Sequence, residues 1–173
     1  MLEKNLPVRK NPRLKGFDYG TAAAYFLTVC THSRKNILSN VVGEGLPLPQ
    51  LTDYGKIAEN WIKKIPEKYR EVSLDSYVIM PNHIHLLLSI EKNDGSGDHS
   101  PTVADIVGWF KYHSTKDINR SRGTEGKKVF QRSFYDHIVR NCADYDDIQK
   151  YICENPLRWR LDKLYAPDNP KDA

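Results

Sequence analysis

The sequence lacks several features that would assign it to common protein classes. No run of about 18 apolar residues occurs along its 173 positions, so it contains no predicted transmembrane helix. Its N-terminal stretch has no apolar core of the kind that marks a secretory signal. Only three cysteines are present, without CxxC spacing, which argues against a disulfide framework or a zinc knuckle. The cysteine pattern favours a protein of the reducing cytoplasm.

What is present is the composition of a globular protein with a mild excess of positive charge. The net charge is +4, and the length fits one domain, with an irregular basic segment at residues 1–20 and a single domain over 21–173. Two basic groups with aromatic residues nearby point to a polyanionic partner. They are Arg9, Lys10, Arg13 and Lys15 in the first group, and Arg120, Arg122, Lys127, Lys128 and Arg132 in the second.

Hydrophobic periodicity predicts alternating strands and helices. Stretches 39–51 and 91–101, which contain glycine and proline, are expected to be loops, and Pro66 is expected to end the first helix. The resulting order, βαββαβ with an appended C-terminal helix, predicts an α+β fold. We expect a ferredoxin-like sandwich with helices on one face of an antiparallel sheet. The predicted strands are 22–31, 71–79, 83–90 and 129–139, and the predicted helices are 51–65, 102–119 and 143–155.

The most informative motif is the pair His83 and His85, which precedes the apolar run 86–88. Residues i and i+2 of a strand point to the same face, about 6 to 7 Å apart, so this strand would present two imidazoles side by side. Two neutral imidazoles on one face can hold a divalent cation. The alternative is that they are ordinary polar residues near the start of a strand, and so short a motif does not separate the two interpretations.

The last predicted helix offers a nucleophile and a further ligand. Tyr151 and Asn155 are four residues apart, which places them on one helical face. The amide oxygen of Asn155 can complete a two-imidazole site for a hard cation, and the phenol of Tyr151 can attack a phosphodiester. Pro156 disfavours helical geometry at Asn155. Tyr151 taken alone is better explained as an aromatic residue that packs the helix onto the sheet, and Tyr135 and Tyr145 are neighbouring alternatives.

Together these residues resemble the single-tyrosine HUH transposases, and within that family the REP-associated tyrosine transposases. The resemblance is carried by residues 13–38, 80–90 and 129–163. The His-x-His motif of the family stands here as His83-Ile84-His85. Its Tyr-x-x-x-Asn-Pro pattern stands as the stretch from Tyr151 to Pro156.

The resemblance implies an enzyme that cuts and rejoins single-stranded DNA at hairpins such as repetitive extragenic palindromes. In such an enzyme His83, His85 and Asn155 would hold Mg²⁺ or Mn²⁺, and Tyr151 would attack to leave a 5′-phosphotyrosine and a free 3′-hydroxyl. The two basic groups would then contact the hairpin backbone and the phosphates near the cleavage point. The resemblance also implies DNA transposition on the bacterial nucleoid, by a monomer or a homodimer without a membrane partner.

Other interpretations of the same residues stay open. A ferredoxin-like module can bind single-stranded nucleic acid without chemistry, with the histidines in a structural role. A metal-dependent hydrolase would use water as its nucleophile, with Tyr151 only positioning the substrate. A domesticated transposase that no longer moves itself would have the same sequence features as a mobile one. His137 is expected to make a structural hydrogen bond.

Overall fold

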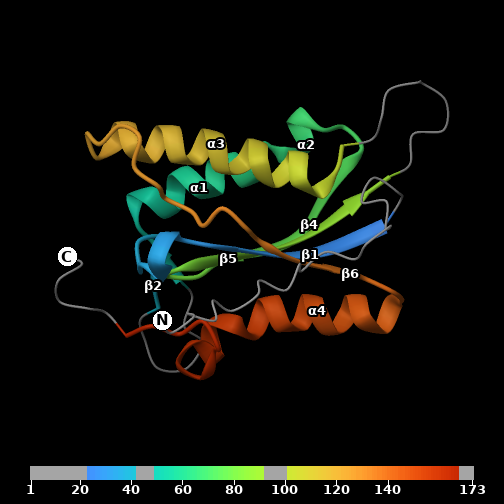
Figure 1. Cartoon of the computed structure of the whole chain (residues 1–173). Coiled ribbons are helices and arrows are strands. Elements are labelled where there is room, and N and C mark those ends of the chain that lie inside the picture. The colour runs from blue at the N-terminus through green and yellow to red at the C-terminus, as the bar shows by residue number, and fades with distance from the viewer. Residues whose placement is uncertain (1–22, 42–48, 92–100, 168–173) are drawn as a thin grey trace, which may run out of the picture.

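The computed structural model describes residues 23–41, 49–91 and 101–167, and it contains a sheet with helices on both faces (Figure 1). Helices α1 (Asp53–Lys63) and α3 (Val103–Ser121) cover one face, and α4 (Cys142–Glu154) lies across the other. Neighbouring strands of the main sheet are antiparallel, so the predicted mixture of helices and antiparallel sheet is confirmed. The strands lie in the order β4 (Val72–Ile79), β5 (His83–Ile90), β1 (Ala23–Cys30) and β6 (Tyr135–Ile138).

One predicted loop proves to contain strands. Within stretch 39–51, β2 (Ser39–Val41) pairs antiparallel with β3 (Pro49–Leu51) as a separate two-stranded sheet. The side chain of Ser39 donates a hydrogen bond to the carbonyl of Ile79 at 2.8 Å, which ties this small sheet to the end of β4. The glycines and prolines of the stretch concealed the pairing, because they are typical of turns.

Two other element boundaries also differ from the prediction. Pro66 does not end the helical path, since it lies in the first turn of a short second helix, α2 (Ile65–Lys68), where its missing N–H costs no hydrogen bond. The predicted strand 129–139 is broken, because only its β6 portion joins the sheet and an isolated bridge links Phe130 to Thr31. None of the described helices combines the length and apolar character that crossing a membrane requires.

Strand β5 is buried on both faces because it lies inside the sheet. Its odd-numbered positions His83, His85 and Leu87 face α4, where Leu87 packs against Ile148 and Ile152 of that helix. Its even-numbered positions face the larger core under α1 and α3, namely Ile84, Leu86, Leu88 and Ile90. The alternation of the strand therefore directs both imidazoles toward α4.

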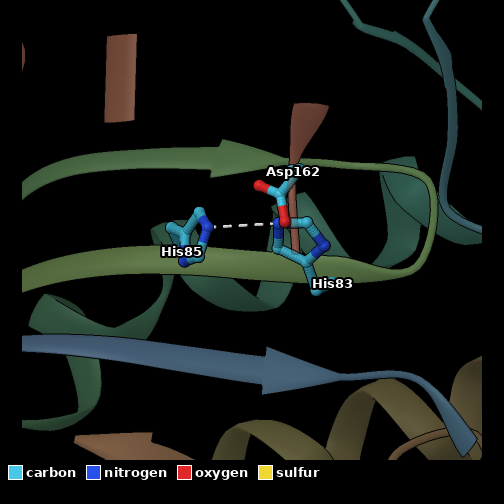
Figure 2. A group of neighbouring side chains, drawn as sticks. All are labelled: His83, His85 and Asp162. Atoms are coloured by element: carbon cyan, nitrogen blue, oxygen red, sulfur yellow. Dashed lines mark hydrogen bonds between the residues drawn. The ribbon is translucent and has the colours of Figure 1, made fainter. Parts of the chain in front are cut away.

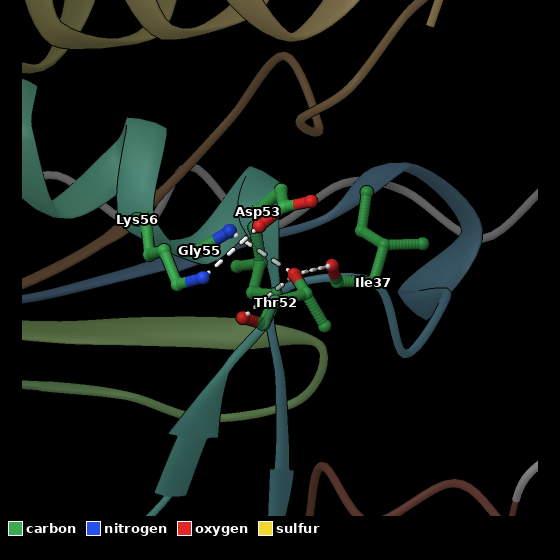
Figure 3. Close-up of polar contacts among 6 residues, drawn as sticks. Ile37, Thr52, Asp53, Gly55 and Lys56 are labelled. Carbon is green, nitrogen blue, oxygen red and sulfur yellow. Dashed lines mark hydrogen bonds and ion pairs between the residues drawn. The ribbon is translucent and has the colours of Figure 1, made fainter. Parts of the chain in front are cut away.

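The start of α1 is held against the segment that leads into β2 (Figure 3). The Thr52 hydroxyl accepts a hydrogen bond from the Gly55 N–H at 3.1 Å and donates one to the Ile37 carbonyl at 2.6 Å. The Thr52 N–H donates to the Leu38 carbonyl at 3.0 Å. The N–H groups of Ile37 and Leu38 in turn donate to the Pro81 carbonyl at 2.9 and 3.0 Å. This contact therefore supports the turn from which β5 begins.

Replacing Gly55 by alanine is expected to lower the free energy of unfolding by about 1 to 3 kcal/mol. A Cβ at Gly55 would overlap the Leu38 carbonyl oxygen, which is backbone and already accepts a hydrogen bond from Thr52. Gly108→Ala is the matched control, because a Cβ at that exposed position of α3 meets nothing within 4 Å. The free energy of unfolding of this control is expected to rise by about 0.5 to 1 kcal/mol. Urea unfolding measures both, and unchanged stability in Gly55→Ala would contradict the close approach.

Candidate active site

The two histidines of β5 face each other beneath α4. Their Nε2 atoms are 3.1 Å apart, and His83 is fully buried. The Nδ1 atom of His83 lies 2.9 Å from the Asn82 side-chain oxygen, and the Asn82 side-chain nitrogen donates to the Leu164 carbonyl at 2.9 Å. That second bond orients the Asn82 amide, so His83 carries its proton on Nδ1 and its lone pair on Nε2. The Nδ1 atom of His85 is 2.9 Å from the Thr28 hydroxyl.

Burial keeps this histidine pair neutral. Loss of solvation lowers the pKa of His83 to about 4. Loss of solvation, followed by the effect of a charge on His83, lowers the pKa of His85 well below its usual 6.5. Neutral imidazole is the form that binds metal ions. Two nitrogens 3.1 Å apart can both lie about 2.1 Å from one ion, so the pair fits a single divalent cation.

Acid is expected to destabilise the metal-free protein between pH 6.5 and about 4. Unfolded chains bind a proton at His83 with a pKa near 6.5, but the folded protein binds it only near pH 4. The unfolded state therefore holds more protons in this interval, so the free energy of unfolding falls as the pH falls. The total decrease is about 3 kcal/mol. Urea unfolding in the presence of a chelator measures the effect, and the difference from His83→Gln isolates it from other groups. Identical pH profiles for the two proteins would contradict it.

Helix α4 brings Tyr151 to the histidine pair of the same chain. Its hydroxyl lies 3.5 Å from Nε2 of His85, and its ring meets Phe26 of β1 edge-on at 5.9 Å between centroids. The residue is 43% exposed and lines a cavity that a substrate can enter. Burial and the negative charge of Asp162 raise the pKa of Tyr151 above its usual value. The phenol is therefore protonated at neutral pH, and nearby positive charge would be needed to ionise it.

Asn155 directly follows α4 and begins a 3-10 segment, η2 (Asn155–Leu161), with Pro156 in its first turn. Its backbone keeps helical angles (φ −55°, ψ −41°), so it still lies one turn beyond Tyr151. The side-chain nitrogen donates to Asp162 at 2.9 Å. The buried side-chain oxygen accepts no hydrogen bond from the residues that the structure describes. An unpaired buried oxygen beside two imidazoles has the chemistry expected of a metal ligand.

Asp162 is a residue of this site that the sequence motifs did not identify. One carboxylate oxygen lies with ring nitrogens of His83 and His85 in a group whose atoms are all within 4.8 Å of one another. Figure 2 shows the carboxylate directed at the two imidazoles from the segment after η2. Asp162 lies within a stretch that carries the family resemblance, yet no spacing rule connects it with the histidines. Only the folded chain brings them together.

A cavity of about 960 Å³ opens beside Tyr151. Phe26, Phe134 and Tyr135 contribute aromatic surface to its walls, and Lys163 contributes positive charge. Arg158 also lines the cavity, where it pairs with Glu154 at 2.8 Å. Aromatic rings flanked by cationic groups are typical of surfaces that bind single-stranded nucleic acid, where bases stack on the rings and phosphates pair with the charges.

The second basic group lies at the end of α3 and in the segment that follows it. Two of its members have partners within the chain: Arg120 pairs with Asp117 at 3.0 Å, and Arg122 donates to the Asn119 side-chain oxygen at 2.6 and 3.0 Å. These contacts reduce their availability to phosphates.

The remaining members of that group, Lys127, Lys128 and Arg132, are exposed, and their side chains form no ion pair with the described residues. The first basic group lies outside the described residues, namely Arg9, Lys10, Arg13 and Lys15. The Nε2–H of His137 donates a hydrogen bond to the Asp144 carboxylate at 3.0 Å, which confirms the structural contact expected for it.

Comparison with known proteins adds independent findings. The family described as "Transposase IS200 like" matches residues 21–155. An uncharacterised protein of Haemophilus influenzae is 30% identical over 173 residues, covering 91% of this chain and 93% of its own. The REP-associated tyrosine transposase of Escherichia coli is 24% identical over 140 residues, covering 81% and 70%. A solved structure of a REP-associated tyrosine transposase bound to a REP hairpin shares the fold, with a TM-score of 0.58 at 20% identity over 82% of this chain and 71% of that one.

Proposed function

This chain belongs to the IS200-like transposase family, and on that basis we propose that it cleaves and rejoins single-stranded DNA at hairpin elements through a covalent bond to Tyr151. Transposase is its enzyme class, as it is for the family and the E. coli relative. The observation that carries the finer proposal is the approach of the Tyr151 hydroxyl to within 3.5 Å of His85 in one chain.

In the proposed reaction the Tyr151 oxygen attacks the scissile phosphorus in line with the bond to the 3′ oxygen. The new oxygen–phosphorus bond forms as the bond to the 3′ oxygen breaks. The phenol loses its proton and the departing 3′ oxygen gains one. The DNA is left with a 5′-phosphotyrosine and a 3′-hydroxyl. Attack by the 3′-hydroxyl of a second strand end reverses the exchange and frees Tyr151, so no nucleotide cofactor is needed.

We propose that His83, His85 and Asn155 hold a divalent cation, Mg²⁺ or Mn²⁺, during this reaction. The fit is supported by the two facing Nε2 atoms and by the unpaired oxygen of Asn155. A cation held by these residues would neutralise charge on the phosphoryl group and would favour the ionised form of a nearby nucleophile. The protein's own part is to keep both imidazoles neutral, to fix the His83 tautomer through Asn82, and to hold Tyr151 beside them.

The DNA is expected to approach the face of the sheet that carries α4, where the cavity beside Tyr151 opens. We propose that unpaired nucleotides next to the scissile phosphate enter the cavity beside Tyr151, where Phe134 and Tyr135 offer stacking surfaces. The exposed cations of the second basic group, with those of the first, would contact phosphates of the hairpin stem. These are Lys127, Lys128 and Arg132, and Arg9, Lys10, Arg13 and Lys15.

Hairpin DNA is the proposed partner because a protein of the same fold was solved with a REP hairpin bound. A monomer would suffice for cleavage, since Tyr151 lies beside the histidines of its own chain. The proposed place of action is the bacterial cytoplasm, on DNA of the nucleoid.

Incubation of the purified protein with 3′-labelled single-stranded hairpin DNA and Mn²⁺ tests the proposal. A labelled band at the mass of protein plus DNA on a denaturing gel is the expected result, because the phosphotyrosine stays attached to the 3′ fragment. Cleavage without such a band would indicate a hydrolase that uses water. Binding without cleavage would indicate a nucleic-acid-binding module.

A further inference from the structure

The carboxylate of Asp162 stands beside the proposed cation site, outside both sequence motifs. We propose that Asp162 is itself a ligand of the cation, so that the site is built from β5, the end of α4 and the segment after η2. The inference deepens the proposed function and rests on it for the identity of the site. It adds the site's one charged protein ligand.

The position of the carboxylate supports this role. One of its oxygens and a ring nitrogen from each of His83 and His85 lie within 4.8 Å of one another (Figure 2). Its Oδ2 atom accepts a hydrogen bond from the Asn155 amide at 2.9 Å, and its Oδ1 atom accepts one from the Leu164 N–H at 2.6 Å. A carboxylate has about four lone-pair positions, so these two bonds orient it and leave capacity for a cation.

The segment that carries Asp162 is anchored to the protein. Trp159 is buried, and its ring lies 5.9 Å from that of His83. The Leu164 carbonyl accepts a hydrogen bond from Asn82, the residue that also orients His83. Further on, the Ala166 carbonyl accepts one from Asn36 at 2.9 Å. These contacts fix the carboxylate relative to the histidines in the way that a preformed ligand requires.

Charge gives a second, independent reason. His83, His85 and Asn155 are neutral donors, whereas Mg²⁺ in proteins is usually bound through one or two carboxylates. Asp162 supplies that charge. Within the described part of the chain it forms no salt bridge, so no cationic side chain competes with a bound cation for its charge. The geometry and the missing countercharge therefore point to the same occupant.

The test is Mn²⁺ binding by the full-length protein without DNA, measured by isothermal titration calorimetry. Asp162→Asn and Asp162→Ala are expected to raise the Kd by about tenfold or more, the scale seen when groups around a metal site are removed. Asp162→Glu, which keeps the carboxylate, is expected to recover part of the affinity. Asp147→Asn is the matched control, because it removes the same charge from an exposed position of α4 and is expected to leave the Kd unchanged. Thermal melting in chelator verifies that each variant is folded.

Two results would overturn the inference. An unchanged Kd in both Asp162→Asn and Asp162→Ala would mean that the carboxylate does not contact the cation and acts elsewhere, for instance on Tyr151. A lower Kd would mean that the carboxylate competes with the cation. Failure of the proposed function looks different, because wild-type protein would bind Mn²⁺ with the expected dependence on Asp162 and yet form no covalent bond with DNA.

Discussion

Replacing Tyr151 by phenylalanine will abolish the covalent protein–DNA product and lower the cleavage rate by at least about 10⁴-fold, the scale expected when a covalent nucleophile is removed. The substitution removes one oxygen atom, whose contact with Nε2 of His85 is long at 3.5 Å. The ring that packs against Phe26 remains. Stability and hairpin affinity are therefore expected to stay near wild-type values, so that a loss of activity can be attributed to the chemistry. Gel analysis of labelled DNA under denaturing conditions measures the product.

Tyr145→Phe is the matched control for this variant. Tyr145 lies on the same helix, six residues before Tyr151, and packs against the cluster of Leu87, Ile148 and Ile152. The Tyr145→Phe variant is expected to form the covalent product at the wild-type rate. If Tyr151→Phe retained the product while Tyr145→Phe lost it, the assignment of the nucleophile would be wrong.

Replacing either His83 or His85 by alanine is expected to weaken Mn²⁺ binding by at least about 100-fold and to remove DNA cleavage at micromolar Mn²⁺. Each ring supplies one of the two nitrogens that face each other at 3.1 Å, and a single imidazole cannot replace the pair. Calorimetry measures the binding and the DNA assay measures the cleavage. A chelator is expected to reproduce the loss of cleavage in wild-type protein.

The controls for the histidine variants separate metal binding from folding. Both rings are buried, and their removal leaves the Asn82 oxygen or the Thr28 hydroxyl without its present partner, which costs about 1 to 3 kcal/mol. Thermal melting must therefore show that the variants are folded at the assay temperature. His32→Ala, at an exposed position, is expected to bind Mn²⁺ as wild type does. Wild-type affinity in His83→Ala or His85→Ala would contradict the proposed cation site.

Local regularity explains which parts of this site were predictable from the sequence. The period of two in a strand puts His83 and His85 on one face, and the structure confirms that placement. The helical period places Asn155 one turn beyond Tyr151, and this holds despite Pro156 because the backbone at Asn155 keeps helical angles. A proline disfavours helical angles at the residue before it but does not forbid them, and Asn155 adopts them. The roles of these residues remain predictions.

The features that escaped prediction depend on contacts between distant segments. Asp162 reaches the histidines through an irregular segment that Asn82 and Asn36 hold in place, and such contacts leave no periodic signal in a sequence. The β2–β3 hairpin was hidden for a related reason, since its residues are typical of turns and its pairing is short. The ion pair of Arg120 with Asp117 and the hydrogen bond of Arg122 to Asn119 were likewise not predictable from the sequence.

The central claim is that Tyr151 becomes bonded to DNA, and peptide mass spectrometry tests it most directly. Trypsin separates the three candidate tyrosines, because Tyr135, Tyr145 and Tyr151 lie in the peptides 133–140, 141–150 and 151–158. After reaction with hairpin DNA and Mn²⁺, digestion with nuclease and trypsin is predicted to leave a nucleotide, linked through its 5′ phosphate, on peptide 151–158. A nucleotide on either of the other peptides, or cleaved DNA with all three unmodified, would contradict the account.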